Sequence, residues 1–268
     1  MIIIILITGW ILHIGFPLVY IRGPKRTPCL MPNIKHKDRA PPDAEGLGTS
    51  ADETAELVRW IEAGSLPELN PTRQARSLRT TVALLAAGAR LLQARSLEDF
   101  SVEEVCREAG LTVGSFYGRF EGKHAFFVTM QRIQVLRAGA ELKRLESNTG
   151  AESASLDEFC RELVQLIVHR FRQDVGVLRA SLQHTQEGMW EPFRLLGDRY
   201  RATLIEQVSP LLKHLPPRQR QLRVQFAFQA LTGTLVHAVL NNPGPLMLDD
   251  PRLVPELTRL LRAYLNSE

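Results

Sequence analysis

The sequence contains little cysteine, and proline is missing from a long central stretch. Its three cysteines, Cys29, Cys106 and Cys160, are too scattered for a disulfide framework or a zinc site, so a reducing compartment is the simpler interpretation. Proline is absent from Thr72 to Glu191, which permits long helices there. There is no alternating strand pattern and no internal repeat, and the sequence therefore predicts an all-α fold.

Sequence patterns that carry enzymatic chemistry are also missing. There is no His-Glu-x-x-His, no Gly-x-Ser-x-Gly and no phosphate-binding loop, and the histidines show no paired spacing. Gly46-Leu47-Gly48 lies in a proline-rich stretch, without the flanking strand and helix that a nucleotide-binding turn needs. We therefore expect no enzymatic activity, no metal site and no cofactor.

The overall composition is that of a globular protein with a basic balance. Of 268 residues, 44% are hydrophobic and 23% are charged, and the net charge is +4. Residues 72–146 carry 12 Lys and Arg against 8 Asp and Glu. This excess agrees with a polyanionic partner such as DNA but does not require one.

The first twenty-one residues contain no Asp, Glu, Lys or Arg. As a helix they would span about 31 Å, enough to cross a bilayer. Arg22, Lys25 and Arg26 follow this apolar segment, which would leave the N-terminus outside and the rest in the cytoplasm. The alternative is a translation start assigned too far upstream, with Met31 as a possible later start. Residues 1–21 are thus either a membrane anchor or untranslated sequence upstream of the true start of a cytoplasmic protein.

Residues 22–74 read as a proline-rich linker, which we expect to be disordered. Seven of the sixteen prolines fall between Arg22 and Arg73. The exception is Ala51 to Ala63, where Leu57, Trp60 and Ile61 share a helical face. This stretch is either a short docking helix or a helix that forms transiently.

Downstream of the linker, the sequence predicts two short helices joined by a turn. Ser101 is placed as the N-cap of the first, with Glu104 at the capping-box position. Gly110 is suited to end that helix, and Thr112 to cap the next. Phe116 is expected to point into the core. The expected helices in this part are 80–94, 102–109, 112–118 and one that begins at Lys123.

Two short helices joined by a glycine-containing turn are the layout of a helix-turn-helix. Its second helix must enter the major groove, so its first residues must be small or able to hydrogen-bond to bases. Gly114 permits close approach, Val113 offers a contact for a thymine methyl group, and Tyr117 is placed to meet a phosphate. The residues expected to contact DNA here are Thr112, Val113, Gly114, Ser115, Tyr117 and Lys123.

These residues stand in an order that is more specific than a generic helix-turn-helix. The order comprises Ala-Arg-Leu-Leu at 89–92, Phe-Ser-Val-Glu-Glu-Val at 100–105, Glu-Ala-Gly-Leu-Thr-Val-Gly-Ser-Phe-Tyr at 108–117 and Gly-Arg-Phe-Glu-Gly-Lys-His-Ala-Phe at 118–126. In this order the chain resembles the TetR-type (TetR/AcrR) bacterial transcriptional regulators. The resemblance runs from about Thr80 to Met130.

The resemblance implies a three-helix DNA-binding domain, residues 75–125, followed by a larger helical ligand-binding and dimerisation domain, residues 126–268. Thr112, Ser115, Tyr117 and Lys123 match the family's usual phosphate or base contacts, and Val113 and Gly114 match the front of its recognition helix. Ser101 and Thr81 match positions near the DNA backbone. The chain departs from the family at Ser96, where many members have glycine, and in the roughly 75 residues before the motif.

The resemblance also implies sites in the second domain. The last two long helices, Arg218 to Leu240 and Pro251 to Leu265, would form a dimer interface, and an effector pocket would lie among the preceding helices. The residues expected at the dimer interface are Phe228, Leu231, Leu235, Val239, Leu257 and Leu261. Those expected in the effector pocket are Phe171, Gln183, Trp190 and Phe193.

Together these features predict a cytoplasmic, homodimeric transcriptional regulator that binds double-stranded DNA. We expect a repressor that recognises a near-palindromic operator and is released by a small-molecule effector, which the sequence does not identify. The alternative is a membrane-tethered DNA-binding regulator, anchored by residues 1–21.

Overall fold

The computed structural model describes residues 51–70, 75–147, 155–185, 188–241 and 244–267. The chain divides into two units, residues 1–44 and 45–268, and all described residues belong to the second. Within them the fold is all-α, as predicted, with an isolated bridge between Leu69 and Phe120 as the sole β-type pairing. The apolar segment 1–21 and most of the predicted linker lie outside the described residues.

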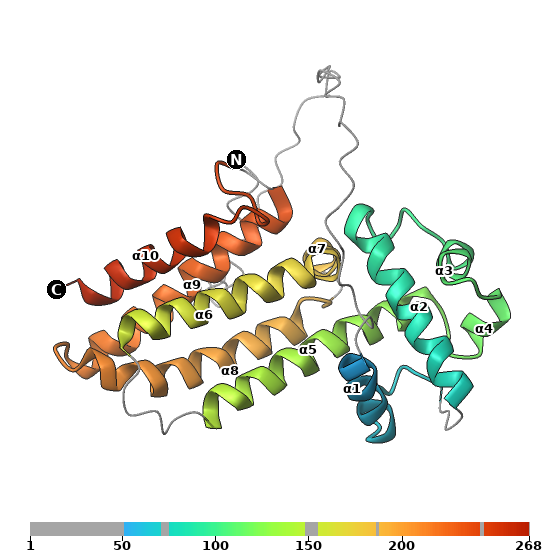
Figure 1. Cartoon of the computed structure of the whole chain (residues 1–268), viewed down its shortest axis with the longest axis horizontal. Coiled ribbons are helices and arrows are strands. Elements are labelled where there is room, and N and C mark those ends of the chain that lie inside the picture. Colours follow the sequence, from blue (N-terminus) through green and yellow to red (C-terminus); the bar gives the residue numbers. More distant parts are fainter. Residues whose placement is uncertain (1–50, 71–74, 148–154, 186–187, 242–243, 268) are drawn as a thin grey trace, which may run out of the picture. The chain divides into compact units, whose positions relative to one another are not determined.

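Five helices form the first part of this unit (Figure 1). The first lies within the predicted linker, and the next three match the predicted three-helix domain. Their bounds are α1 Ala51–Glu62, α2 Ala75–Ala94, α3 Val102–Ala109, α4 Val113–Tyr117 and α5 Lys123–Ser147.

The remaining helices are α6 Leu156–Gln173, α7 Val175–Gln183, α8 Glu191–Val208, the 3-10 helix η3 Ser209–Leu212, α9 Pro217–Asn241 and α10 Leu253–Asn266. The last two of these helices lie close to the ranges predicted for them, 218–240 and 251–265. In the described part of the chain, no helix is both long and apolar enough to span a bilayer.

One hydrophobic core holds the helix-turn-helix. Phe116, Phe120, Phe126 and Phe127 are all fully buried in it. The Phe120 and Phe126 rings meet edge-on with centroids 5.0 Å apart, a geometry that aromatic pairs favour. This core fixes α4 and the start of α5 against α2 and α3.

A second core lies among α6, α8, α9 and α10. The start of α5 belongs to the first core through Phe126 and Ile133, and its later part reaches the second through Ala138 and Leu142 (Figure 1). Polar contacts join the same elements, because Arg170 donates to Glu141 at 2.8 Å and the Tyr200 hydroxyl donates to the Ala138 carbonyl at 3.1 Å. The helix α5 is therefore shared by the two cores.

The sequence predicts disorder in the linker outside Ala51 to Ala63, and this prediction is wrong for residues 64–70, which the structure describes as turns and a bridge. The stretch from Ala51 is helical, as the alternative of a docking helix foresaw, and Leu57 and Leu66 are buried in the first core. The segment is ordered because its apolar face finds a partner surface, which proline and glycine content alone does not reveal.

Candidate nucleic-acid interface

The helices α3 and α4 form a helix-turn-helix whose ends are closed by side-chain and backbone caps. The Ser101 hydroxyl accepts from the Glu104 amide at 3.3 Å, and the Glu104 carboxylate accepts from the Ser101 amide at 2.9 Å. Gly110 ends α3 with φ of 67°, in the left-handed region that favours glycine. These three predictions are confirmed, and the caps fix the turn before α4.

Two hydroxyls meet at the N-terminus of α4. Thr112 caps the helix by accepting from the Ser115 amide at 3.2 Å, and the Thr112 and Ser115 hydroxyl oxygens lie 2.9 Å apart. A hydroxyl has one donor and two acceptor positions, so both groups retain capacity for a further hydrogen bond. Val113 and Gly114 follow directly, and Gly114 is exposed.

Neighbouring aromatic residues of α4 point in opposite directions. Phe116 is fully buried, as predicted, whereas the Tyr117 residue is 52% exposed. The two rings meet nearly at right angles with centroids 5.5 Å apart, so the buried ring supports the exposed one. The recognition helix thus presents Thr112, Gly114 and Tyr117 to solvent from a rigid base.

Lys123 begins α5 but its ammonium turns toward the protein. It donates to the Phe100 carbonyl and lies 4.8 Å from the centre of the Phe100 ring. Partial burial lowers the pKa of Lys123. An ammonium has three donors, so one bond to Phe100 leaves others for a phosphate, and the predicted DNA contact stays a prediction.

Two of the predicted contact residues are used inside the protein. Thr81 is 1% exposed and its hydroxyl donates to the Ser77 carbonyl at 3.1 Å. A side chain buried in this way does not reach DNA, so the prediction for Thr81 is corrected. Ser101 is exposed, and its hydroxyl serves the capping box of α3.

The charges around the motif are largely paired. Arg95 donates to Glu104 at 2.9 Å and Arg90 donates to Glu108 at 2.8 Å. The bond from Arg95 is the main cause that lowers the pKa of Glu104. Arg107 lies in the last turn of α3, and its side chain is 77% exposed. The sequence reasoning passed over Arg107, although a basic residue beside a recognition helix is a recognisable signal.

The four residues predicted for an effector pocket lie in different surroundings, and their role in a pocket stays a prediction. Trp190 and Phe193 contact each other with ring centroids 5.3 Å apart, Phe171 packs against the second core, and Gln183 is exposed. A small apolar hollow, with room for about one water molecule, lies among α6, α8, α9 and α10. The spacing of aromatic residues along a chain does not say which of them face a common space.

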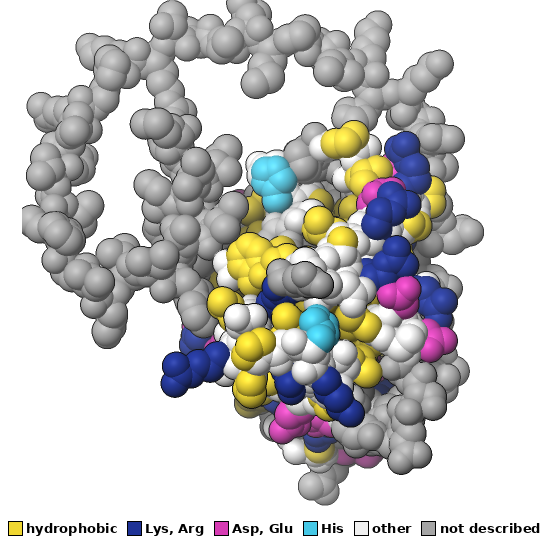
Figure 2. Space-filling view, turned by 90° about the vertical axis from the view of Figure 1, so that its left-hand side faces the viewer, with side chains coloured by type: hydrophobic (Ala, Val, Ile, Leu, Met, Phe, Trp, Pro, Cys, Tyr) yellow, Lys and Arg dark blue, Asp and Glu magenta, His cyan; other side chains and the backbone are white. Residues whose placement is uncertain are grey.

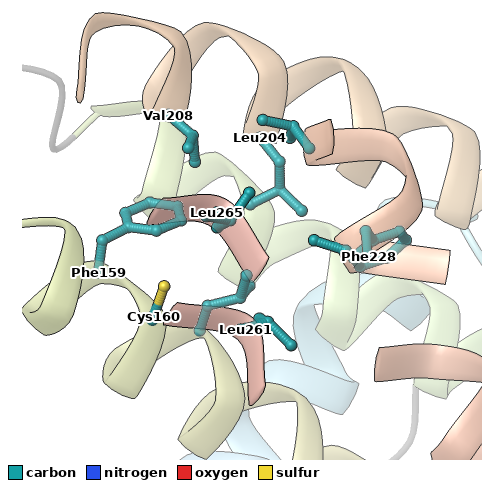
Figure 3. Close-up of a pocket in the computed structure, with 10 residues that line it drawn as sticks. Phe159, Cys160, Leu204, Val208, Phe228, Leu261 and Leu265 are labelled. Carbon is teal, nitrogen blue, oxygen red and sulfur yellow. The ribbon is translucent and has the colours of Figure 1, made fainter. Parts of the chain in front are cut away.

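Hydrophobic side chains from all four helices converge on this hollow (Figure 3). Its wall includes Phe159, Cys160, Leu204, Phe228 and Leu265. Burial raises the pKa of the Cys160 thiol to about 11, so the thiol stays neutral at physiological pH. In the described residues no group of His, Cys, Asp and Glu side chains could hold a metal ion.

The residues predicted for the dimer interface are buried within the chain itself. Each is at most 6% exposed, and all except Val239 belong to the second core, so the prediction is corrected. The six residues are Phe228, Leu231, Leu235, Val239, Leu257 and Leu261. They form the inner faces of α9 and α10, where burying apolar surface stabilises the subunit itself.

The outer faces of the same two helices carry exposed apolar residues. Leu222 is 64%, Phe226 is 49% and Leu260 is 52% exposed. The rings of Phe226 and Tyr264 lie 5.4 Å apart and join the two helices. Hydrophobic side chains are exposed among Lys and Arg on the side of the molecule that Figure 2 shows.

The helices α2 and α7 meet in a close joint between the two cores. A Cβ atom at Gly176 would lie 2.6 Å from the carbonyl carbon and oxygen of Leu92, so only glycine fits there. Arg179 donates to the carbonyls of Leu92 and Gln93, at 2.5 and 3.0 Å. A guanidinium at the C-terminal end of a helix compensates the helix dipole, and the joint is thus both tight and charged.

The fold and the exposed, capped recognition helix define a helix-turn-helix DNA-binding protein. Residues 84–130 match the profile of the bacterial regulatory proteins of the tetR family, and residues 155–265 match that of the tetracyclin repressor-like C-terminal domain. The two profiles together cover more than half of the chain. The chain belongs to the tetR family, and its function is DNA-binding transcription regulation.

Solved structures of similar chains are distant in sequence. The fatty acid degradation regulator FadR from Bacillus halodurans is 17% identical, with 71% of this chain and 96% of that one covered and a TM-score of 0.46. A TetR/AcrR transcriptional regulator from Thermobifida fusca YX-ER1 is 18% identical, with 70% and 97% covered and a TM-score of 0.47. The repressor AlkX from Dietzia sp. strain DQ12-45-1b is 16% identical, with 69% and 94% covered and a TM-score of 0.36. No curated protein matches the chain significantly.

Proposed function

We propose that the chain is a homodimeric repressor that binds a near-palindromic operator and is released by a small-molecule effector. The observation that carries the proposal is the outer face of α4, which is capped by Thr112 at its N-terminus and exposed at Gly114 and Tyr117. A short helix presented in this way from a packed support has the form needed to enter a major groove.

The residues of α4 divide into two roles in this proposal. Val113, Gly114 and the hydroxyls of Thr112 and Ser115 approach the base edges, where a thymine methyl or a base acceptor can be read. Tyr117 and Lys123 bind phosphates, which position the helix without reading sequence. The exposed Arg107 adds a further phosphate contact.

The dimer forms through the outer faces of α9 and α10. Leu222 and Phe226 are one turn apart on α9, Leu240 lies four turns further on, and Leu260 continues the apolar face on α10. Self-association through this surface gives a two-fold dimer. Its recognition helices would then lie about 34–36 Å apart, one turn of DNA.

The shared helix α5 and the joint between α2 and α7 support release by an effector. An effector that enlarges the apolar hollow displaces α6 and α8, and α5 and the α2–α7 joint carry this shift to the DNA-binding helices. The carbon-rich wall of the hollow favours an apolar effector.

The test is binding of the purified full chain to DNA from the region upstream of its own gene, titrated at several salt concentrations with non-specific competitor DNA. We expect tight, competitor-resistant binding whose affinity falls steeply with salt, since phosphate contacts release counterions. Binding without sequence preference, or no binding by a folded dimer, would contradict the proposal.

A further inference from the structure

The segment that follows α1 reaches the far end of the recognition helix. The Asn70 amide donates to the Arg119 carbonyl at 2.8 Å, and the Asn70 side chain donates to the Tyr117 carbonyl at 3.4 Å. Leu69 and Phe120 form the isolated antiparallel bridge. The last carbonyls of a helix have no partner within it, so Asn70 supplies donors where α4 ends.

The same segment is anchored in the core below α4. Leu57 and Leu66 are buried at 5% and 4% exposure, and Trp60, Ile61 and Leu69 pack against the core that holds Phe116 and Phe120. Since α4 has only five residues, too few for a helix that is stable alone, its orientation depends on such neighbours.

Ion pairs tie the segment to α5 as well. The Arg132 Nε donates to both carboxylate oxygens of Glu68, at 3.0 and 3.1 Å. The buried Arg137 lies 3.9 Å from Glu56. Both arginines belong to α5, the helix that enters both cores (Figure 1).

We propose that residues 55–70, the brace, position the recognition helix by holding its C-terminal end to α5. Glu68 and Asn70 are positioning residues in this proposal, which rests on the proposed DNA-reading function of α4. The family profile begins at residue 84, so the brace is an addition to the part of the DNA-binding domain that this profile describes.

The charge of the brace distinguishes positioning from a direct DNA contact. Its ionisable side chains are Glu56, Arg59, Glu62 and Glu68, three acids against one base. An arm that binds the phosphate backbone needs the opposite balance. The brace therefore acts on DNA binding through α4 and α5.

The experiment uses the full chain with Glu68→Arg, Arg132→Glu and the double exchange, each measured for operator affinity, salt slope and thermal midpoint. We expect each single variant to lower operator affinity at least about threefold, because each places like charges together, and the double variant to recover it. The control is Asp157→Arg, which breaks a pair with Arg262 between α6 and α10 at 3.0 Å and should leave affinity unchanged. Glu68→Gln shows the same direction of effect should Glu68→Arg not fold.

Long-range electrostatics would give a different result from positioning. Added positive charge in Glu68→Arg would raise DNA affinity, and added negative charge in Arg132→Glu would lower it. An affinity of Glu68→Arg at or above the wild-type value, or a double variant as weak as the weaker single variant, overturns the brace.

A second readout separates this inference from the proposed function. Amide hydrogen exchange at Arg119 and Phe120, measured without DNA, should be faster in Glu68→Arg than in the wild type. If the wild type binds no operator, the proposed function fails. The role of the brace is then tested by the amide hydrogen exchange rates alone. Unchanged exchange at these two amides overturns it.

Discussion

The Lys123 ammonium donates to the main-chain carbonyl of Phe100 and lies 4.8 Å from the centre of the Phe100 ring. This contact joins the start of α5 to the loop before α3. One side chain thus stabilises the motif from inside, and its other donors are the ones that the proposed phosphate contact would use.

Lys123→Ala should lower both stability and DNA affinity. We expect the slope of log affinity against log salt to become shallower by about one per subunit, because one phosphate contact is lost from each. Salt titration with operator DNA measures the slope, and thermal unfolding measures stability. An unchanged slope with a lower thermal midpoint would assign Lys123 to the Phe100 contact alone.

Tyr117→Phe should weaken DNA binding and leave the fold intact. Within the described residues the exposed Tyr117 hydroxyl makes no hydrogen bond, so the change should cost little stability. Losing the proposed bond to a phosphate should reduce affinity by about 0.5–1.5 kcal/mol. Tyr200→Phe is the matched control, since its hydroxyl donates to the Ala138 carbonyl at 3.1 Å. Tyr200→Phe should lower the free energy of unfolding by about 1 kcal/mol, and affinity loss there instead of at Tyr117 would contradict the prediction.

Gly176→Ala should disturb the joint between α2 and α7. Its Cβ atom would lie 2.6 Å from the Leu92 carbonyl group, so the backbones must separate. We expect a loss of about 1–3 kcal/mol in the free energy of unfolding, measured by denaturant titration. Gly197→Ala, whose Cβ atom would meet only the flexible Arg201 at 3.7 Å, should be neutral or stabilising. Equal effects of the two changes would show that the close approach of the backbones at Gly176 does not determine the loss of stability.

Leu260→Glu should prevent formation of the proposed dimer without unfolding the subunit. Leu260 is 52% exposed on the outer face of α10. A carboxylate buried at the interface in its place would lose its hydration without gaining a partner of opposite charge. Leu195→Glu is the control, because Leu195 on α8 is exposed to the same degree, 52%. Sedimentation of both variants over a range of concentrations is the measurement. A dimer that survives Leu260→Glu would place the interface elsewhere.

Local signals in the sequence predicted the helix-turn-helix in detail. The capping pair Ser101 and Glu104, the helix end at Gly110 and the burial of Phe116 all stand as predicted. These features depend on residues three or four positions apart, whose geometry the helix itself determines.

Features that depend on contacts between distant residues were not predictable in this way. The helix α9 has apolar residues on two sides, and the pattern alone did not show that Phe228 faces inward and Phe226 outward. The burial of Thr81 and the engagement of Lys123 with Phe100 likewise depend on how separate helices pack. Periodicity identifies an apolar face, but it does not identify what covers that face.

The close seating of Gly176 on Leu92 has a mechanical consequence. Because the backbones touch and Arg179 holds the last carbonyls of α2, we expect the two helices to resist sliding past each other more than rotating about the contact. When one helix rotates about this contact, residues that lie further from the contact move through a larger distance for the same rotation angle. Under the proposed release by an effector, a slight tilt that starts beside α7 would therefore move the recognition helix further than it moves α7 itself.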